Sequence, residues 1–181
     1  HIQEKLVFFN ITEPTPFQTA SIPIIKSGTN VYCTAPKDSG KTTTLVLTTL
    51  QKLKCEASGN APRAVILVEN KERAMELYEL FLAYTKYNSL RVYVGHEQLH
   101  IDIQKSEIFE GTDILISTPK TMNKLFLLNG VSTAQLKIIS IDDAEFLSQH
   151  SSYSAIMSIS QSIQKCQYVI YSEKSTPMLK R

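Results

Sequence analysis

Few residues in this sequence mark a cross-linked, metal-bound or membrane-embedded protein. It has only three cysteines, Cys33, Cys55 and Cys166, and they lack the paired spacing of metal ligands. We therefore expect free thiols in a reducing compartment, with no disulfide and no zinc site. No apolar run is long enough to span a membrane, and the chain does not start with the basic and apolar segments of a secretion signal.

The sequence also carries little excess charge. A net charge of +2 does not by itself mark a protein that binds nucleic acid through electrostatics. The hydrophobic fraction of 43% and the length of 181 residues are typical of one globular domain with a sizeable core. Because the chain begins with His1 rather than Met, we expect an excised fragment, and residues 176–181 look like an exit toward a partner domain.

Short β-rich runs alternate with longer segments of helical period. Several of the runs are continuously apolar, as expected for strands that are covered on both faces. The expected strands are 30–34, 64–68, 91–94, 113–117, 137–141 and 168–172, and the expected helices are 41–54, 71–87, 120–128 and 153–164. This alternation predicts an α/β fold, with a mostly parallel central sheet and helices on both faces. Ligands of such sheets bind beyond the carboxyl ends of the strands.

The stretch CTAPKDSGKTTTL (33–45) has the features of a phosphate-binding loop between a strand and a helix. In Ser39-Gly40-Lys41-Thr42, the glycine would let the backbone approach an anion. The lysine would reach the terminal phosphates, and the threonine hydroxyl would coordinate Mg²⁺. Asp38 opposes this, at roughly 3 kcal/mol for a carboxylate about 5 Å from a phosphate charge. We expect weakened nucleotide binding, and an ordinary helix cap is the alternative interpretation.

A second motif, IISIDDAEFL (138–147), ends a buried strand with two adjacent carboxylates. In nucleotide hydrolases the first acid after such a strand holds Mg²⁺, and the next can polarise the attacking water. Asp142 and Asp143 occupy these positions. The alternative is that Asp143 or its neighbours cap the helix that follows.

With these motifs in order, nearly the whole chain resembles the first RecA-like domain of DEAD-box RNA helicases, a P-loop NTPase fold. PTPFQ (14–18) resembles the adenine-recognition motif, in which Gln18 would read the adenine edge. The phosphate loop matches at Ala35, Gly40, Lys41 and Thr42. DDAE (142–145) stands in the place of the naming motif, with Asp143 where the family has the catalytic glutamate. SEK (172–174) keeps only the serine of Ser-Ala-Thr.

The segments that face RNA in this family are altered as well. ENKERA (69–74) stands for Pro-Thr-Arg-Glu-Leu-Ala, VGH (94–96) keeps one of two glycines, and STPKT (117–121) lacks the final arginine. By resemblance, Lys71, Gly95, Thr118 and Lys120 would contact the RNA sugar-phosphate backbone, weakly and with strong salt dependence. For the two lysines, solvated surface is the alternative.

The resemblance implies ATP and Mg²⁺ as cofactors, with Lys41, Asp142 and Asp143 as catalytic residues. It implies RNA as a partner, and a second RecA-like domain that residues 1–181 do not include. Shortening the catalytic side chain by one methylene shifts a carboxylate, and a misplacement of about 1 Å can cost on the order of a hundredfold in rate. We therefore expect an ATP-binding domain that is weak in hydrolysis.

A rival hypothesis is a degenerate scaffold of the same fold that binds RNA or protein. The helicase-like regions of Tudor-domain proteins in the piRNA pathway are a narrower resemblance of this kind. An unrelated nucleotide kinase or GTPase would not explain the series of motifs. The expected location is the cytoplasm, with ribonucleoprotein granules as one candidate site within it.

Overall fold

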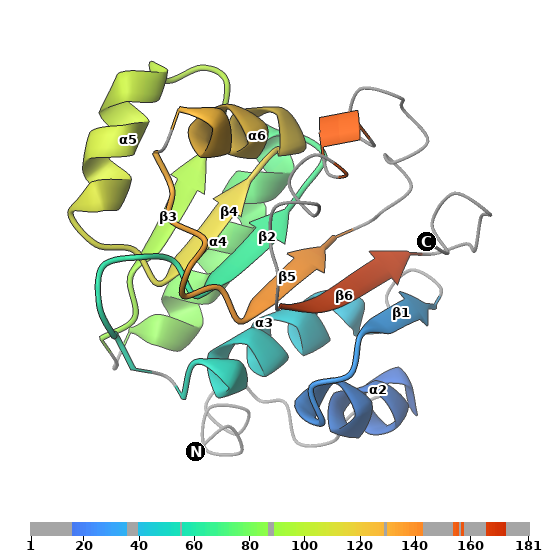
Figure 1. The fold of residues 1–181 in the computed structure, drawn as a ribbon. Coiled ribbons are helices and arrows are strands. Elements are labelled where there is room, and N and C mark those ends of the chain that lie inside the picture. Colours follow the sequence, from blue (N-terminus) through green and yellow to red (C-terminus); the bar gives the residue numbers. More distant parts are fainter. Residues whose placement is uncertain are drawn as a thin grey trace.

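A parallel β-sheet forms the centre of the molecule (Figure 1). The computed structural model describes residues 16–35, 40–54, 56–86, 89–128, 130–142, 154, 155, 157 and 166–172. Within these ranges the six strands follow the order β1-β6-β5-β2-β4-β3, and every neighbouring pair is parallel. The strands are β1 (Val31–Thr34), β2 (Ala64–Leu67), β3 (Val92–Gly95), β4 (Ile114–Ser117), β5 (Ile138–Ile141) and β6 (Gln167–Ser172).

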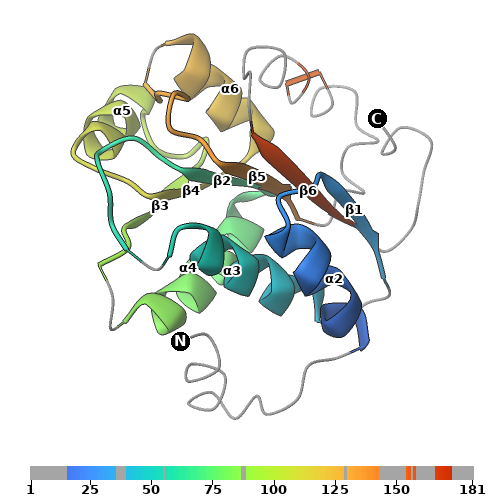
Figure 2. The same cartoon turned by 60° about the horizontal axis from the view of Figure 1, so that its bottom comes forward.

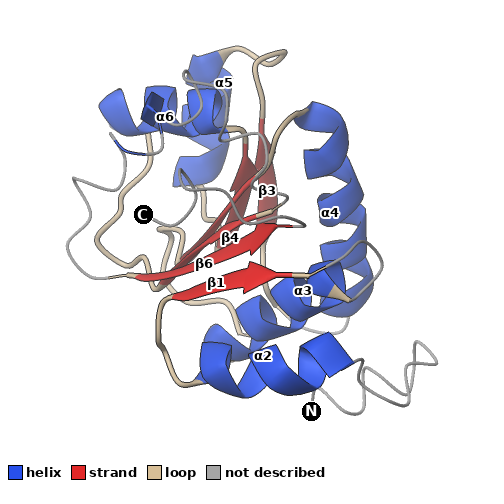
Figure 3. Cartoon of the chain, turned by 90° about the vertical axis from the view of Figure 1, so that its right-hand side faces the viewer, coloured by secondary structure: helices blue, strands red, loops and turns tan. Residues whose placement is uncertain are grey.

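Helices cover both faces of this sheet. Figures 2 and 3 show α2 (Pro16–Lys26), α3 (Lys41–Lys52) and α4 (Lys71–Thr85) on one face. On the other face lie α5 (Ile101–Phe109) and α6 (Pro119–Leu127). The predicted fold class is therefore confirmed. In the described ranges, no helix has the length and apolar character needed to cross a membrane.

The core consists of two apolar clusters, one on each side of the sheet. In β2, Ala64 and Ile66 belong to the cluster under α3 and α4, whereas Val65 and Leu67 belong to the cluster under α6. Successive side chains of a strand point to opposite faces, so a strand covered on both sides needs apolar residues throughout. This explains why all four residues of β2, β4 and β5 are buried.

Two helices of the structure, α2 and α5, were not predicted from the sequence, and some observed boundaries differ from the predicted ones. Helix α2 contains Pro23, which normally disfavours a helix interior. Helix α5 buries only Gln104 and Ile108, so it has no continuous apolar stripe to reveal it. Helices α3 and α4 end two residues earlier than predicted, and α6 begins at Pro119. Most of the helix expected at 153–164 lies outside the described residues.

Candidate functional site

The carboxyl ends of the parallel strands bring several expected site residues to one edge of the sheet. Ala35 follows β1, Asp142 follows β5, and Thr118 follows β4, while Gly95 ends β3. The strand arrowheads in Figure 1 mark this edge. It is the edge at which open α/β sheets bind their ligands.

The described part of the phosphate loop is held by contacts to its own backbone. Gly40, at the start of α3, has φ 93°, a left-handed conformation that glycine adopts without strain. Lys41 is 8% exposed, and its ammonium donates to the Ala35 carbonyl oxygen at 2.6 Å. Ser39, with Lys37 and Asp38, lies outside the described residues.

Gln18, the expected adenine reader, lies against this loop. Its side chain is buried, and its Nε2 donates to the Gly40 carbonyl oxygen at 3.4 Å. Helix α2 also packs on α3, the helix that follows the phosphate loop. The structure thus brings Gln18 together with Gly40 and Lys41, although 22 residues separate Gln18 from Gly40.

An arginine joins the two residues that the sequence analysis assigned to Mg²⁺. Arg73 Nε donates to Asp142 Oδ2 at 2.5 Å, and Arg73 Nη2 donates to Thr42 Oγ1 at 2.9 Å and to Asp142 Oδ1 at 3.3 Å. The Asp142 side chain is 2% exposed and that of Arg73 is 24% exposed. The guanidinium therefore lies between the hydroxyl and the carboxylate.

This arrangement does not fit Mg²⁺. The metal takes oxygen ligands in a near-octahedral shell at about 2.0–2.1 Å, and here the two candidate ligands already accept hydrogen bonds from one cation. Asp143, the second expected carboxylate, lies outside the described residues.

The residues expected to meet RNA lie along the same edge, at the carboxyl ends of β2, β3 and β4. Lys71 is the first residue of α4, and its Nζ donates to Gln98 Oε1 at 2.8 Å. Lys120, in the first turn of α6, is exposed. Thr118 caps α6 by accepting from Thr121 N at 3.4 Å.

A carboxylate faces the amino end of α6. Glu97 Oε1 accepts a hydrogen bond from Thr118 Oγ1 at 2.6 Å. Helix amino ends attract anions, because their first N–H groups lack partners within the helix. Glu97 therefore places a negative charge beside Thr118, one of the residues that the resemblance led us to expect at the RNA backbone.

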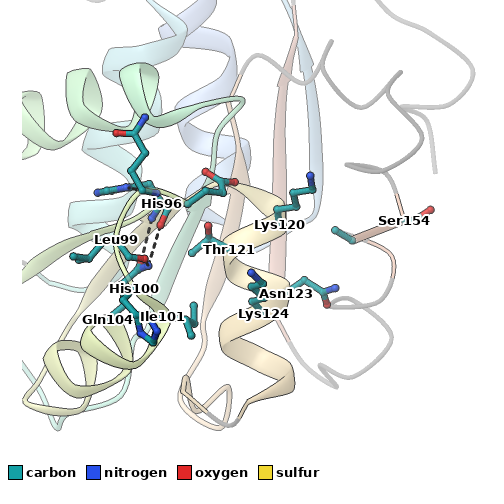
Figure 4. Close-up of a pocket in the computed structure, with 13 residues that line it drawn as sticks. His96, Leu99, His100, Ile101, Gln104, Lys120, Thr121, Asn123, Lys124 and Ser154 are labelled. Atoms are coloured by element: carbon teal, nitrogen blue, oxygen red, sulfur yellow. Dashed lines mark hydrogen bonds between the residues drawn. The ribbon is translucent and has the colours of Figure 1, made fainter.

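A cavity of about 800 Å³ opens beside this carboxylate (Figure 4). The loop 96–101 forms one wall, and side chains of α6 such as Lys120 and Lys124 form another. Gln104, which is buried, shapes the loop: its Nε2 donates to the carbonyl oxygens of His96 at 2.9 Å and Leu99 at 2.8 Å. The Gln104 side chain thus helps to hold in place the loop that lines the cavity.

Gly95 has a packing reason to be glycine. A Cβ atom there would lie 3.1 Å from Gln104 Oε1 and 3.2 Å from Ser117 Oγ, closer than ordinary carbon contacts. The backbone at Gly95 therefore passes close to side chains of α5 and β4.

Three residues that shape this edge of the sheet were not expected from the sequence: Arg73, Glu97 and Gln104. A signal existed for Arg73, because it stands at the leucine of Pro-Thr-Arg-Glu-Leu-Ala in ENKERA (69–74). For Glu97 and Gln104 the sequence offers no comparable signal, because their partners come from other elements.

The fold, the loop after β1 and the acid after β5 define a nucleotide-binding α/β domain of the P-loop type. Residues 15–174 match the family model of the DEAD/DEAH box helicases, and the chain belongs to this family.

Among its relatives is the ATP-dependent RNA helicase DBP10 of Scheffersomyces stipitis, 30% identical over 148 residues; the match covers 79% of this chain and 16% of that protein. The probable ATP-dependent RNA helicase ddx52 of Dictyostelium discoideum is 31% identical over 135 residues, 75% of this chain and 20% of that protein. This chain thus spans a fifth or less of either relative.

The fold is also similar to that of a solved structure, the yeast DEAD-box splicing factor Prp28. The TM-score is 0.87 at 18% sequence identity, and the match covers 99% of this chain and 45% of that one. At this identity the likeness supports the fold, the parallel sheet covered by helices on both faces.

Proposed function

We propose that this domain is the ATP-binding half of a DEAD-box-type ATP-dependent RNA helicase, and that it is weak in hydrolysis. Gln18 reads the adenine, while Ala35, Ser39, Gly40, Lys41 and Thr42 hold the phosphates. The main support is that Thr42, beside the phosphate-loop lysine, is joined to Asp142 through a single guanidinium, which brings two distant motifs together at one edge of the sheet. Its relatives, named as ATP-dependent RNA helicases, support the same assignment.

Two features support weak turnover. Asp143 is one methylene shorter than the family's catalytic glutamate, and small misplacements of such groups are costly. In addition, the family needs arginines from a second RecA-like domain to complete the site. We propose that residues 1–181 form one such domain and that another part of the parent protein supplies the second.

RNA is the proposed second ligand, bound through its sugar-phosphate backbone by Lys71, Gly95, Thr118 and Lys120. Glu97 opposes this binding, because its carboxylate repels a phosphate at the amino end of α6. The proposed affinity is therefore low and falls steeply with salt.

A catalytically silent scaffold is the second candidate function. It is favoured because the domain's own side chains occupy the positions expected for the metal ion and for an RNA phosphate. Arg73 lies between Thr42 and Asp142, and Glu97 lies at the amino end of α6. In this role the domain would bind RNA or protein, as in the helicase-like regions of Tudor-domain piRNA proteins. We propose the cytoplasm, including ribonucleoprotein granules, as its location.

Titration with a fluorescent ATP analogue tests the nucleotide site. Lys41→Ala removes the ammonium under the phosphate loop and is expected to weaken binding by about tenfold or more. Lys26→Ala is the matched control, because it removes the same charge from the exposed last turn of α2. An unchanged affinity in Lys41→Ala would show that the phosphate-loop assignment is wrong. Steady RNA-stimulated hydrolysis by residues 1–181 alone would contradict the proposed weakness.

A further inference from the structure

We propose that Arg73 serves as the built-in cation of the nucleotide site, so that this domain binds nucleotide phosphates without Mg²⁺. The proposal rests on the proposed function, since it concerns the same site. It starts from the finding that the expected metal ligands, Thr42 and Asp142, share one guanidinium.

The backbone fixes where Arg73 begins. Asn70 is the cap of α4, and its Oδ1 accepts from Arg73 N at 2.9 Å, which sets Arg73 in the first turn. Strands β2 and β5 are neighbours in the sheet, and Asp142 N donates to Leu67 O at 3.0 Å. The start of α4, just after β2, therefore lies beside the end of β5.

The side chain is then held from several directions. Nη1 pairs with the exposed Glu76 at 3.0 Å, while Nε reaches the buried Asp142 and Nη2 reaches Thr42. A guanidinium has five donors in a rigid plane, remains charged at all ordinary pH values, and matches a carboxylate with two parallel hydrogen bonds. It also suits phosphate oxygens for the same reason.

A divalent ion at this position would have to displace the guanidinium from two oxygens. It would also place its own charge close to that of Arg73, and like charges in a partly buried site repel. Arg73 and Lys41 together offer a guanidinium and an ammonium to a triphosphate, and the Asp142 and Glu76 carboxylates that pair with Arg73 offset part of this charge. This accounts for phosphate binding without a metal, although it provides less positive charge than a lysine with Mg²⁺.

The family's pattern offers a direct test, because it has leucine at the position of Arg73. Binding of a fluorescent ATP analogue is followed by anisotropy in excess Mg²⁺ and, separately, in excess EDTA. In the wild-type domain the two affinities are expected to differ by less than about threefold. In Arg73→Leu the carboxylate of Asp142 is released, and Mg²⁺ is expected to tighten binding by about tenfold or more.

Lys86→Leu is the matched control. It removes one positive charge at the other end of the same helix, about 20 Å away at roughly 1.5 Å per residue. Its binding should remain as insensitive to Mg²⁺ as that of the wild type. As a second readout, Mg²⁺ without nucleotide should raise the melting temperature of Arg73→Leu but not that of the wild type.

The outcomes separate this inference from the proposed function. Binding by the wild type only with Mg²⁺ would overturn the role of Arg73 and leave the nucleotide site intact. Equal binding with and without Mg²⁺ in Arg73→Leu would also overturn it. Absence of binding by the wild type in both conditions would overturn the inference and the proposed ATP site together. If Arg73→Leu does not fold, the wild-type comparison still decides between a metal-dependent and a metal-free site.

Discussion

Replacing Asp113 by asparagine should destabilise the domain strongly, although this residue lies at the opposite edge of the sheet from the candidate site. The Asp113 side chain is fully buried. Its carboxylate accepts from Arg63 Nη2 at 2.9 Å, from Arg91 Nε at 3.0 Å, and from the backbone N–H groups of Arg91 and Ser58 at 2.9 and 3.1 Å. One charge thus joins the segments that precede β2, β3 and β4.

The size of the effect follows from the exposure of the two arginines. Removing one partner of a buried ion pair costs about 3–5 kcal/mol, because the other charge is left uncompensated. This applies to Arg63, whose side chain is 9% exposed. The side chain of Arg91 is 35% exposed, so water screens its charge and its share is below about 1 kcal/mol. We expect Asp113→Asn to lower the free energy of unfolding by about 3 kcal/mol.

Acid should reduce this difference. Burial alone would raise the pKa of Asp113, but the hydrogen bonds from Arg91, and then those from Arg63 and Ser58, outweigh it and hold the pKa below its usual range. The stabilisation by a carboxylate with a lowered pKa is complete above the unfolded-state pKa, about 4, and is lost as the pH falls through the folded-state pKa. The wild type should therefore approach Asp113→Asn in stability below about pH 4.

Equilibrium unfolding in urea, at pH 7 and at several acidic pH values, measures both effects. Glu79→Gln is the control, because it removes an exposed carboxylate of α4 and should change the stability by less than about 0.5 kcal/mol. Equal unfolding midpoints for Asp113→Asn and the wild type at pH 7 would refute the reasoning. A difference that stays constant down to acidic pH would refute the linkage to the Asp113 carboxylate.

Three further predictions concern the site edge and the core. Glu97→Gln removes the carboxylate at the amino end of α6 and should strengthen binding of single-stranded RNA several-fold, with a steeper salt dependence; weaker binding would contradict its repulsive role. Gly95→Ala places a Cβ 3.1 Å from Gln104 Oε1, which should lower the free energy of unfolding in urea by about 1–3 kcal/mol; an unchanged midpoint would argue against a close approach. Burial raises the pKa of the Cys33 thiol to about 11, so in a Cys55→Ser, Cys166→Ser background a thiol-reactive dye at pH 8 should label Cys33 much faster after unfolding than before; rapid native labelling would contradict this.

Much of the fold could be predicted from local sequence. Strands such as β2 and β4 are buried on both faces, so their composition alone distinguishes them from the helices that follow. Helix α4 can be predicted because Ala74, Leu77 and Phe81 recur on one face. Helix α5 was missed because it buries only two side chains, and a pattern of two positions is too short to indicate a period.

The order of the motifs and the elements that carry them can be predicted from the sequence, because apolar periodicity and strand-to-loop transitions are local properties. The contacts that those motifs make depend on the packing of the folded chain. Arg73 reaches Thr42 and Asp142 across 31 and 69 residues of chain, and Glu97 meets Thr118 across 21. These pairings depend on β2 lying beside β5 and β3 beside β4. The order of strands results from packing the whole chain around two apolar clusters, so no single segment encodes it.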